Sequence, residues 1–208
     1  LAIGNFPPEP PSVADPSFYD GPLYRPDPWA PSALADLDPE APVLLIGTGL
    51  TTIDMVISLL DRQHRGPIHA LSRRGLLPHR HAAAGTAAPA SHARPYPTAL
   101  TALLRHLRQE VVRATEAGAG WRPVIDELRP FTCDVWQTMS AEDRARFIRH
   151  LRPWWEIHRH RIAGFIADRI DGACEVGQLR VAAGRIERFE AAGQGVDVPG
   201  GLLETLVL

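Results

Sequence analysis

The fold is decided by residues 43–52, which read VLLIGTGLTT. The first four residues are apolar, as expected of a central parallel strand that is covered on both faces. A glycine pair follows. Beyond it, the apolar residues recur at the spacing of one helix face, at Ile53, Val56, Ile57 and Leu60. A strand, a glycine turn and an amphipathic helix in this order are typical of a dinucleotide-binding βαβ unit.

The two glycines of this turn have separate physical roles. Gly47 permits a tight turn, because glycine adopts positive φ at little steric cost. Gly49 removes a Cβ, so that a pyrophosphate can approach the backbone N–H groups at the positive end of the helix. We predict that the pyrophosphate is held by Gly47, Thr48, Gly49, Leu50, Thr51 and Thr52. Thr52 replaces the third glycine of the usual motif. The alternative is a strand-to-helix turn that holds no ligand.

A second strand is predicted at residues 68–72, about 20 residues beyond the glycines, the separation at which an NAD site usually has an acid for the ribose 2′-hydroxyl. The chain has Ser72, Arg73 and Arg74 there instead. These residues offer a hydroxyl donor and two guanidinium groups to a 2′-phosphate. The pattern favours NADP(H) over NAD(H). The alternative is a pair of solvated surface arginines.

The rest of the chain indicates a mixed fold. Residues 79–97 have the composition of a loop. Helical spacing follows at 98–118, 121–128, 131–139, 141–151 and 156–171. Ser140 followed by Asp143 indicates a capped helix start. Strands are predicted at 179–182 and 186–189. The expected fold class is α/β: a Rossmann-like parallel sheet with a helical insertion at about 98–171 and a C-terminal β meander.

The N-terminal segment has a different composition. Residues 1–42 hold 11 of the 20 prolines, which fix φ and remove hydrogen-bond donors, so regular structure is not expected there. We expect an extended connector over a neighbouring domain, followed by an NAD(P)-binding domain at 43–208. Five aromatic side chains are expected to hold the connector down: Phe6, Phe18, Tyr19, Tyr24 and Trp29. The start at Leu1 indicates a piece of a longer protein.

Composition and charge exclude several function classes. The net charge is −2 with neutral histidines, so no overall field attracts nucleic acid or an anionic membrane. All 22 basic residues are arginine, so no lysine can form a Schiff base. The absence of lysine, together with abundant alanine and proline, is typical of a protein from a GC-rich bacterial genome. Cys133 and Cys174 fit a reduced, cytoplasmic chain. No apolar run has the length of a membrane span, and no signal peptide is recognised.

Two histidine-containing segments are candidates for a site. His79 and His81 have no further ligands at metal-binding spacing, so no metal site is predicted. Residues 149–161 interleave basic residues with two tryptophans. Either the tryptophans pack while the arginines pair with acids, or a cleft for a cofactor or anionic substrate is lined by His158, Arg159, His160 and Arg161. Nucleic-acid contact through this segment is disfavoured by the net charge. No pattern marks a catalytic acid, base or nucleophile, so catalytic residues stay unassigned.

Several motifs together resemble the bacterial FAD/NAD(P)-binding protein family, which is similar to flavin-containing and N-hydroxylating monooxygenases. The resemblance covers nearly the whole chain. It rests on LAIGNFPP at 1–8, DPW at 27–29, residues 43–54, SRRGLLP at 72–78, WR at 121–122, RHLR at 149–152 and HRHR at 158–161.

The resemblance implies that a pyridine-nucleotide domain is inserted into an FAD domain, with Leu1 to Asn5 at the end of an FAD-domain strand. The FAD glycine motif and the C-terminal part of the flavin site are missing, so FAD is expected in the intact protein rather than in this chain. The expected function is the NADP(H)-binding part of a flavin-dependent oxidoreductase or monooxygenase that passes hydride from NADPH to FAD. This fragment alone is expected to be inactive, and its partners are the missing FAD domain and an unidentified small-molecule substrate. The alternative is a degenerate Rossmann module that acts as a non-catalytic binding or regulatory domain.

Overall fold

The computed structural model describes residues 9–82, 96–189, 191–192, 195–198, 201–203 and 206–207. The chain divides into two compact units, which are described separately. Unit 1 comprises Leu1–Leu77 and Phe165–Leu208, and unit 2 comprises Pro78–Gly164. The expected FAD-domain strand end at Leu1 to Asn5 lies outside the described residues, as does Phe6.

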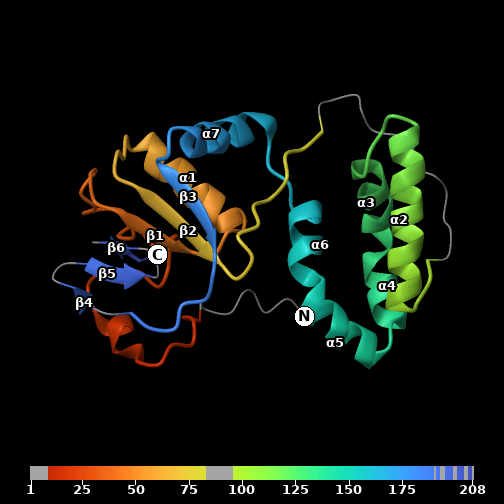
Figure 1. The fold of residues 1–208 in the computed structure, drawn as a ribbon, viewed down its shortest axis with the longest axis horizontal. Coiled ribbons are helices and arrows are strands. Elements are labelled where there is room, and N and C mark those ends of the chain that lie inside the picture. The colour runs from red at the N-terminus through yellow and green to blue at the C-terminus, as the bar shows by residue number, and fades with distance from the viewer. Residues whose placement is uncertain are drawn as a thin grey trace. The chain divides into compact units, whose positions relative to one another are not determined.

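Unit 1 is built on a parallel sheet (Figure 1). Strands β1 (Val43–Ile46), β2 (Ile68–Ser72) and β3 (Leu179–Ala183) lie in the order β3-β2-β1, and the short β7 (Leu206–Val207) pairs with the other edge of β1. The central strand β1 is apolar because it is flanked by strands on both edges and covered on both faces. The expected mixed α/β class with a parallel sheet is therefore confirmed.

Helices α1 (Leu50–Asp61) and α7 (Gly164–Glu175) are the crossover helices of this sheet. α1 connects β1 to β2, and α7 leads into β3. Because both crossovers step across the sheet in the same direction, right-handed connections place the two helices on one face. The ion pair between Arg169 of α7 and Asp61 of α1 agrees with this placement, with 2.6 Å between Nη2 and Oδ1.

The opposite face of the sheet is covered by the N-terminal segment and by the residues after β3. Leu44 and Phe189 are buried together there, and the aromatic rings of a 3-10 helix, η1 (Pro16–Asp20), pack against them. The rings of Phe18 and Phe189 stack with centroids 4.3 Å apart. Tyr19 and Tyr24 join this cluster, whereas Trp29 is 61% exposed. Three of the five aromatic residues that were expected to hold the connector down, Phe18, Tyr19 and Tyr24, therefore pack within unit 1 itself.

A separate three-stranded antiparallel sheet lies between β3 and β7 in the sequence. Its strands are β4 (Ala191–Ala192), β5 (Gly195–Val198) and β6 (Gly201–Leu203), in the order β4-β5-β6. Consecutive antiparallel neighbours make it a meander, as expected for the C-terminal part of the chain.

Unit 2 is helical (Figure 1). It contains α2 (Leu100–Glu116), α3 (Arg122–Leu128), the 3-10 helix η2 (Arg129–Phe131), α4 (Thr132–Thr138), α5 (Ala141–His150) and α6 (Arg152–Arg159). Leu100, Leu103 and Met139 form a buried cluster in it. Ser140 caps α5 as expected, since its hydroxyl accepts a hydrogen bond from the Asp143 N–H at 3.1 Å.

Two predicted elements were wrong. The single helix expected at 156–171 is two helices, α6 and α7, because the residues between them leave the helical conformation and Ile162 bridges to Arg80 in a parallel β-bridge. The strand expected at 186–189 is absent from this described segment, because Phe189 turns into the aromatic cluster while Ala14 donates to the Glu187 carbonyl. The helical unit accordingly ends at Gly164, whereas the expected insertion ended near residue 171.

Within the described residues, no helix combines the length and the apolar character that crossing a membrane requires.

Candidate functional site

The glycine turn lies where β1 ends and α1 begins. Gly47 has φ +120°, a conformation that side-chain-bearing residues rarely adopt, and its N–H donates to the Leu71 carbonyl at 2.8 Å. Gly49 is the N-cap of α1 with an extended backbone, at φ −85° and ψ −164°. A Cβ built on Gly49 would have no atom within 4 Å, so the space in front of this residue is open. No contact within the described residues therefore explains the glycine at position 49.

The first turn of α1 has the features of an anion site. No side chain caps its N–H groups, and the turn contains no acidic residue. Gly49, Leu50 and Thr51 are exposed, whereas Thr52 is 7% exposed and its Oγ1 lies 3.7 Å from the Cβ position of Gly47. Exposed N–H groups at the positive end of a 12-residue helix attract a negative group. Thr52 instead packs inside the turn.

Thr48 joins the glycine turn to the end of β2. Its side chain is buried, and its Oγ1 lies 2.6 Å from the Leu76 carbonyl oxygen and 2.8 Å from Ser72 Oγ. Ser72 Oγ in turn accepts a hydrogen bond from the Gly75 N–H at 3.0 Å. The two loops that were predicted to hold the pyrophosphate and the 2′-phosphate are thus connected by side-chain hydroxyls, a link that no local sequence pattern predicts.

Arg73 and Arg74 lie on the exposed turn between Ser72 and Gly75. Gly75 closes this turn with φ +59°, and its Cβ position lies 3.1 Å from Ala183 N of β3, so both strands fix the turn. Arg73 has no hydrogen bond or ion pair among the described residues. Its guanidinium is therefore available to an anion.

The four residues of the expected cleft in unit 2 fall into two groups by their contacts. His158 and Arg161 both contact Trp121: the ring centroids of His158 and Trp121 are 4.6 Å apart, and Arg161 Cζ lies 5.8 Å from the Trp121 centroid. His160 pairs with Glu156 at 3.0 Å instead, and exposed Arg159 lies against His160, with 3.4 Å between Nη1 and Nε2.

The Trp121 cluster also contains His79 and Arg122. The His79 ring lies 4.7 Å from that of His158 and 5.1 Å from that of Trp121, while Arg122 Cζ lies 4.7 Å from the Trp121 centroid. Burial lowers the pKa of His79, and electrostatic repulsion from the neighbouring His158, Arg122 and Arg161 lowers it further.

The side chain of Arg161 is 3% exposed and paired with Asp126. Arg122 donates two hydrogen bonds to the Arg80 carbonyl, at 3.1 and 3.2 Å. The described cluster therefore packs the segments at 79–81 and 158–162. Arg161 pairs with an acid, as one of the two interpretations of residues 149–161 expects, whereas Trp154 is 44% exposed.

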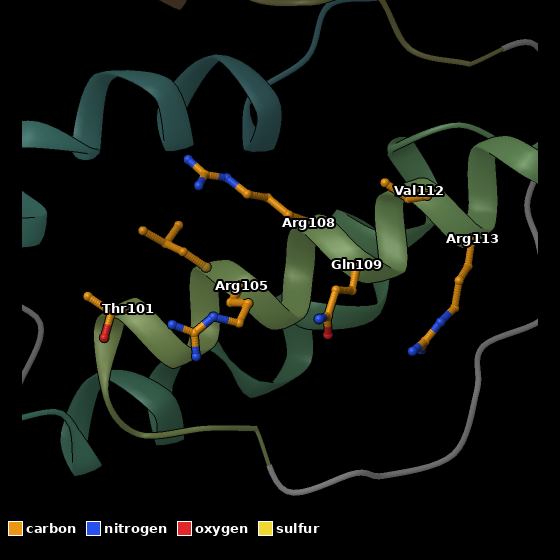
Figure 2. A pocket seen from close by; sticks show the side chains of 7 residues that line it. Thr101, Arg105, Arg108, Gln109, Val112 and Arg113 are labelled. Atoms are coloured by element: carbon orange, nitrogen blue, oxygen red, sulfur yellow. The ribbon is translucent and has the colours of Figure 1, made fainter.

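A shallow cavity of about 630 Å³ lies along the exposed face of α2. The described part of its lining is Thr101, Leu104, Arg105, Arg108, Gln109, Val112 and Arg113. Figure 2 shows the three arginine side chains extending in different directions, so their guanidinium groups do not converge on one point. Arg113 is held by Glu110 at 2.6 Å.

The charges of the chain are divided unequally between the two units. Unit 1 has 9 arginines and 16 acidic residues, a formal charge of −7, whereas unit 2 has 13 arginines and 8 acidic residues, a formal charge of +5. The net charge of −2 conceals this difference. The absence of a field that would attract nucleic acid or an anionic membrane therefore holds for unit 1 and does not extend to unit 2.

Within the described parts of the chain, no group of three or more histidine, cysteine or acidic side chains could hold a metal ion. Comparison of the chain with protein-family models found no match, and comparisons with curated proteins and with solved structures found none either.

Proposed function

We propose that this chain is the NADP(H)-binding part of a flavin-dependent oxidoreductase, with a Rossmann-like parallel sheet as its nucleotide-binding scaffold. The observation that carries the proposal is the open, uncapped N-terminus of α1 at Gly49, beside a turn that bears Arg73 and Arg74. The strand order β3-β2-β1 agrees with the first half of a Rossmann sheet, in which the nucleotide binds beyond the carboxyl ends of the strands.

The pyrophosphate fits the turn between β1 and α1. Its negative charge would lie against the N–H groups of the first turn of α1, and the missing Cβ of Gly49 leaves room for close approach. This arrangement needs no lysine, which suits a chain whose basic residues are all arginine.

The choice of NADP(H) rests on the end of β2. No acidic residue is present at Ser72 to Arg74 for the 2′-hydroxyl of NAD(H). The guanidinium of Arg73 would instead form charge-assisted hydrogen bonds with a 2′-phosphate, since its planar fork matches phosphate oxygens.

The reduced nucleotide supplies a hydride, and the proposed acceptor is FAD in the intact protein. The described residues contain one strand–glycine–helix turn of this geometry, at β1 and α1, so the proposal assigns FAD to a part outside them. This chain would bind and orient the donor, whereas the substrate and any hydroxylation would belong to the intact protein.

Titration of the chain with NADPH and with NADH tests this proposal. We expect NADPH to bind about tenfold or more tightly, the size of one charge-assisted hydrogen bond. Equal affinity would remove the argument from the arginines, and undetectable binding of both nucleotides would remove the proposal. Undetectable binding of both nucleotides would favour the alternative, a degenerate Rossmann module that binds or regulates a partner without turnover.

A further inference from the structure

We propose that Thr48 and Ser72 are positioning residues, which couple the pyrophosphate turn to the arginine turn and so set the preference for NADP(H). This inference rests on the proposed function and goes further in one respect. Under this proposal Ser72 does not contact the 2′-phosphate directly. The Ser72 hydroxyl instead helps to hold the turn that carries Arg73.

The protons of the two hydroxyls can be assigned from their partners. The Leu76 carbonyl oxygen can only accept a hydrogen bond, so the O–H of Thr48 donates to it at 2.6 Å. Thr48 then has no second proton, and the 2.8 Å contact with Ser72 must be donated by Ser72. Ser72 Oγ also accepts from the Gly75 N–H. The only proton of Ser72 is therefore directed toward Thr48 and away from solvent.

With this assignment, Ser72 cannot donate a hydrogen bond to a 2′-phosphate. A 2′-phosphate needs hydrogen-bond donors, and Ser72 retains only a lone pair after its contacts with Thr48 and Gly75. Exposed Arg73 is left as a donor whose guanidinium has no partner among the described residues. The discrimination between NADP(H) and NAD(H) is thereby assigned to an arginine whose position depends on the turn beneath it.

The network connects this turn directly to the pyrophosphate turn. Thr48 lies between Gly47 and Gly49, and its one oxygen contacts both ends of the segment from Ser72 to Leu76. On its other side, the segment is held by the residue that follows β3, since the Gly184 N–H donates to the Ser72 carbonyl at 2.9 Å. Loss of the Thr48 hydroxyl should loosen the arginine turn while the helix N-terminus remains in place.

The variant Thr48→Val tests the coupling, because valine has the shape of threonine without its hydroxyl. We expect the Kd for NADPH to rise about fivefold, the size of one lost neutral hydrogen bond, and to rise more than the Kd for NADH does. Thr48→Ser retains the hydroxyl and should retain most of the preference. Thr115→Val is the matched control, because the Thr115 hydroxyl donates to the Val111 carbonyl of its own helix and has no other hydrogen bond among the described residues.

A double-variant cycle with Arg73→Ala separates positioning from general damage. In the Arg73→Ala background, Thr48→Val should change the Kd for NADPH and the Kd for NADH by the same factor. Equal weakening of both nucleotides by Thr48→Val in the unaltered background would overturn the coupling and leave the proposed function standing. Failure of the unaltered chain to bind either nucleotide would overturn both.

Limited proteolysis provides a readout that needs no nucleotide. Trypsin cleaves after arginine, and the turn presents Arg73 and Arg74 in succession. A loosened turn should be cut several-fold faster in Thr48→Val and Ser72→Ala than in the unaltered chain or in Thr115→Val, as mass spectrometry of early fragments would show. An unchanged cleavage rate at this turn would show that the hydroxyls do not hold it and would overturn the inference.

Discussion

Asp126 is the ion-pair partner of Arg161, whose side chain is only 3% exposed. The Nε of Arg161 has no hydrogen-bond partner within the described residues, so the carboxylate provides the compensating charge for this guanidinium. Removal of one member of such a pair leaves an uncompensated buried charge, whereas removal of both does not.

Asp126→Ala should therefore lower the free energy of unfolding by about 2 kcal/mol, less than for a fully buried pair because Asp126 is half exposed. The double variant Asp126→Ala/Arg161→Met should be more stable than Asp126→Ala alone. Urea unfolding measures both differences. As a control, Asp61→Ala breaks the exposed pair with Arg169 and should lower stability by at most about 1 kcal/mol. A double variant less stable than Asp126→Ala would contradict the prediction.

Gly66 has no room for a side chain. Its N–H and that of Arg65 both donate to the Pro39 carbonyl, at 2.9 and 2.7 Å, which presses the backbone against the preceding loop. A Cβ at position 66 would overlap the Ala41 carbonyl oxygen and lie 2.6 Å from that of Glu40. Because both obstacles are backbone atoms, Gly66→Ala should lower the free energy of unfolding by about 3 kcal/mol.

Gly172→Ala gives the opposite expectation and serves as the matched control for Gly66→Ala. Gly172 lies inside α7, and a Cβ there would have no atom within 4 Å. Alanine should therefore stabilise the chain by about 0.5–1 kcal/mol, the difference in helix propensity. If both alanine variants changed the midpoint of urea unfolding in the same direction, the geometry described for Gly66 would be wrong.

The elements that could be predicted from sequence are those with local causes. The strand at Val43–Ile46, the helix from Leu50 and the strand at Ile68–Ser72 follow from short-range hydrophobic periodicity. The start of α5 follows from Ser140 because its hydroxyl caps a residue only three positions away.

The elements that could not be predicted depend on contacts distant in sequence. The break between α6 and α7 is stabilised by the bridge from Ile162 to Arg80, which no local pattern encodes. The segment ending at Phe189 alternates like a strand but packs against Phe18 instead. The opposite charges of the two units could not be predicted for the same reason, because tertiary contacts determine where each unit begins and ends.

The candidate site divides in the same way. The glycines and arginines of the two turns could be named from their spacing. The contact between Thr48 and Ser72 spans 24 residues and could not. A hydroxyl residue between the two glycines and another at the end of the next strand is the only signal that the sequence offered.

Gly49→Val should abolish nucleotide binding without unfolding the chain. The space at Gly49 is open and its backbone is extended, so valine fits the protein but occupies the position proposed for the pyrophosphate. The free energy of unfolding should change by less than about 1 kcal/mol, the typical effect of a substitution at an N-cap. Gly47→Val, at φ +120°, should destabilise the protein as well. Calorimetric titration with NADPH and urea unfolding of both variants make the comparison. Retained binding by Gly49→Val would exclude this turn as the nucleotide site.

The stability of the chain should fall on acidification, and His64 should contribute to the loss. Its side chain is buried and its Nε2 has no partner within the described residues. Burial lowers the pKa of His64, although a hydrogen bond with the Ala41 backbone and the charges of Glu40 and Asp38 oppose this effect. Burial also lowers the pKa values of His69 and His79.

A pKa lowered on folding means that the unfolded chain binds the proton more tightly than the folded chain does. The free energy of unfolding should therefore be level with respect to these groups above pH 6.5, the value for an unperturbed histidine, and should decrease as pH falls below it toward the folded pKa values. Urea unfolding at a series of pH values between 8 and 5 would measure the slope. His64→Gln should reduce that slope, and His150→Gln, on the exposed face of α5, is the comparison. A slope unaffected by His64→Gln would mean that the loss on acidification arises from other groups.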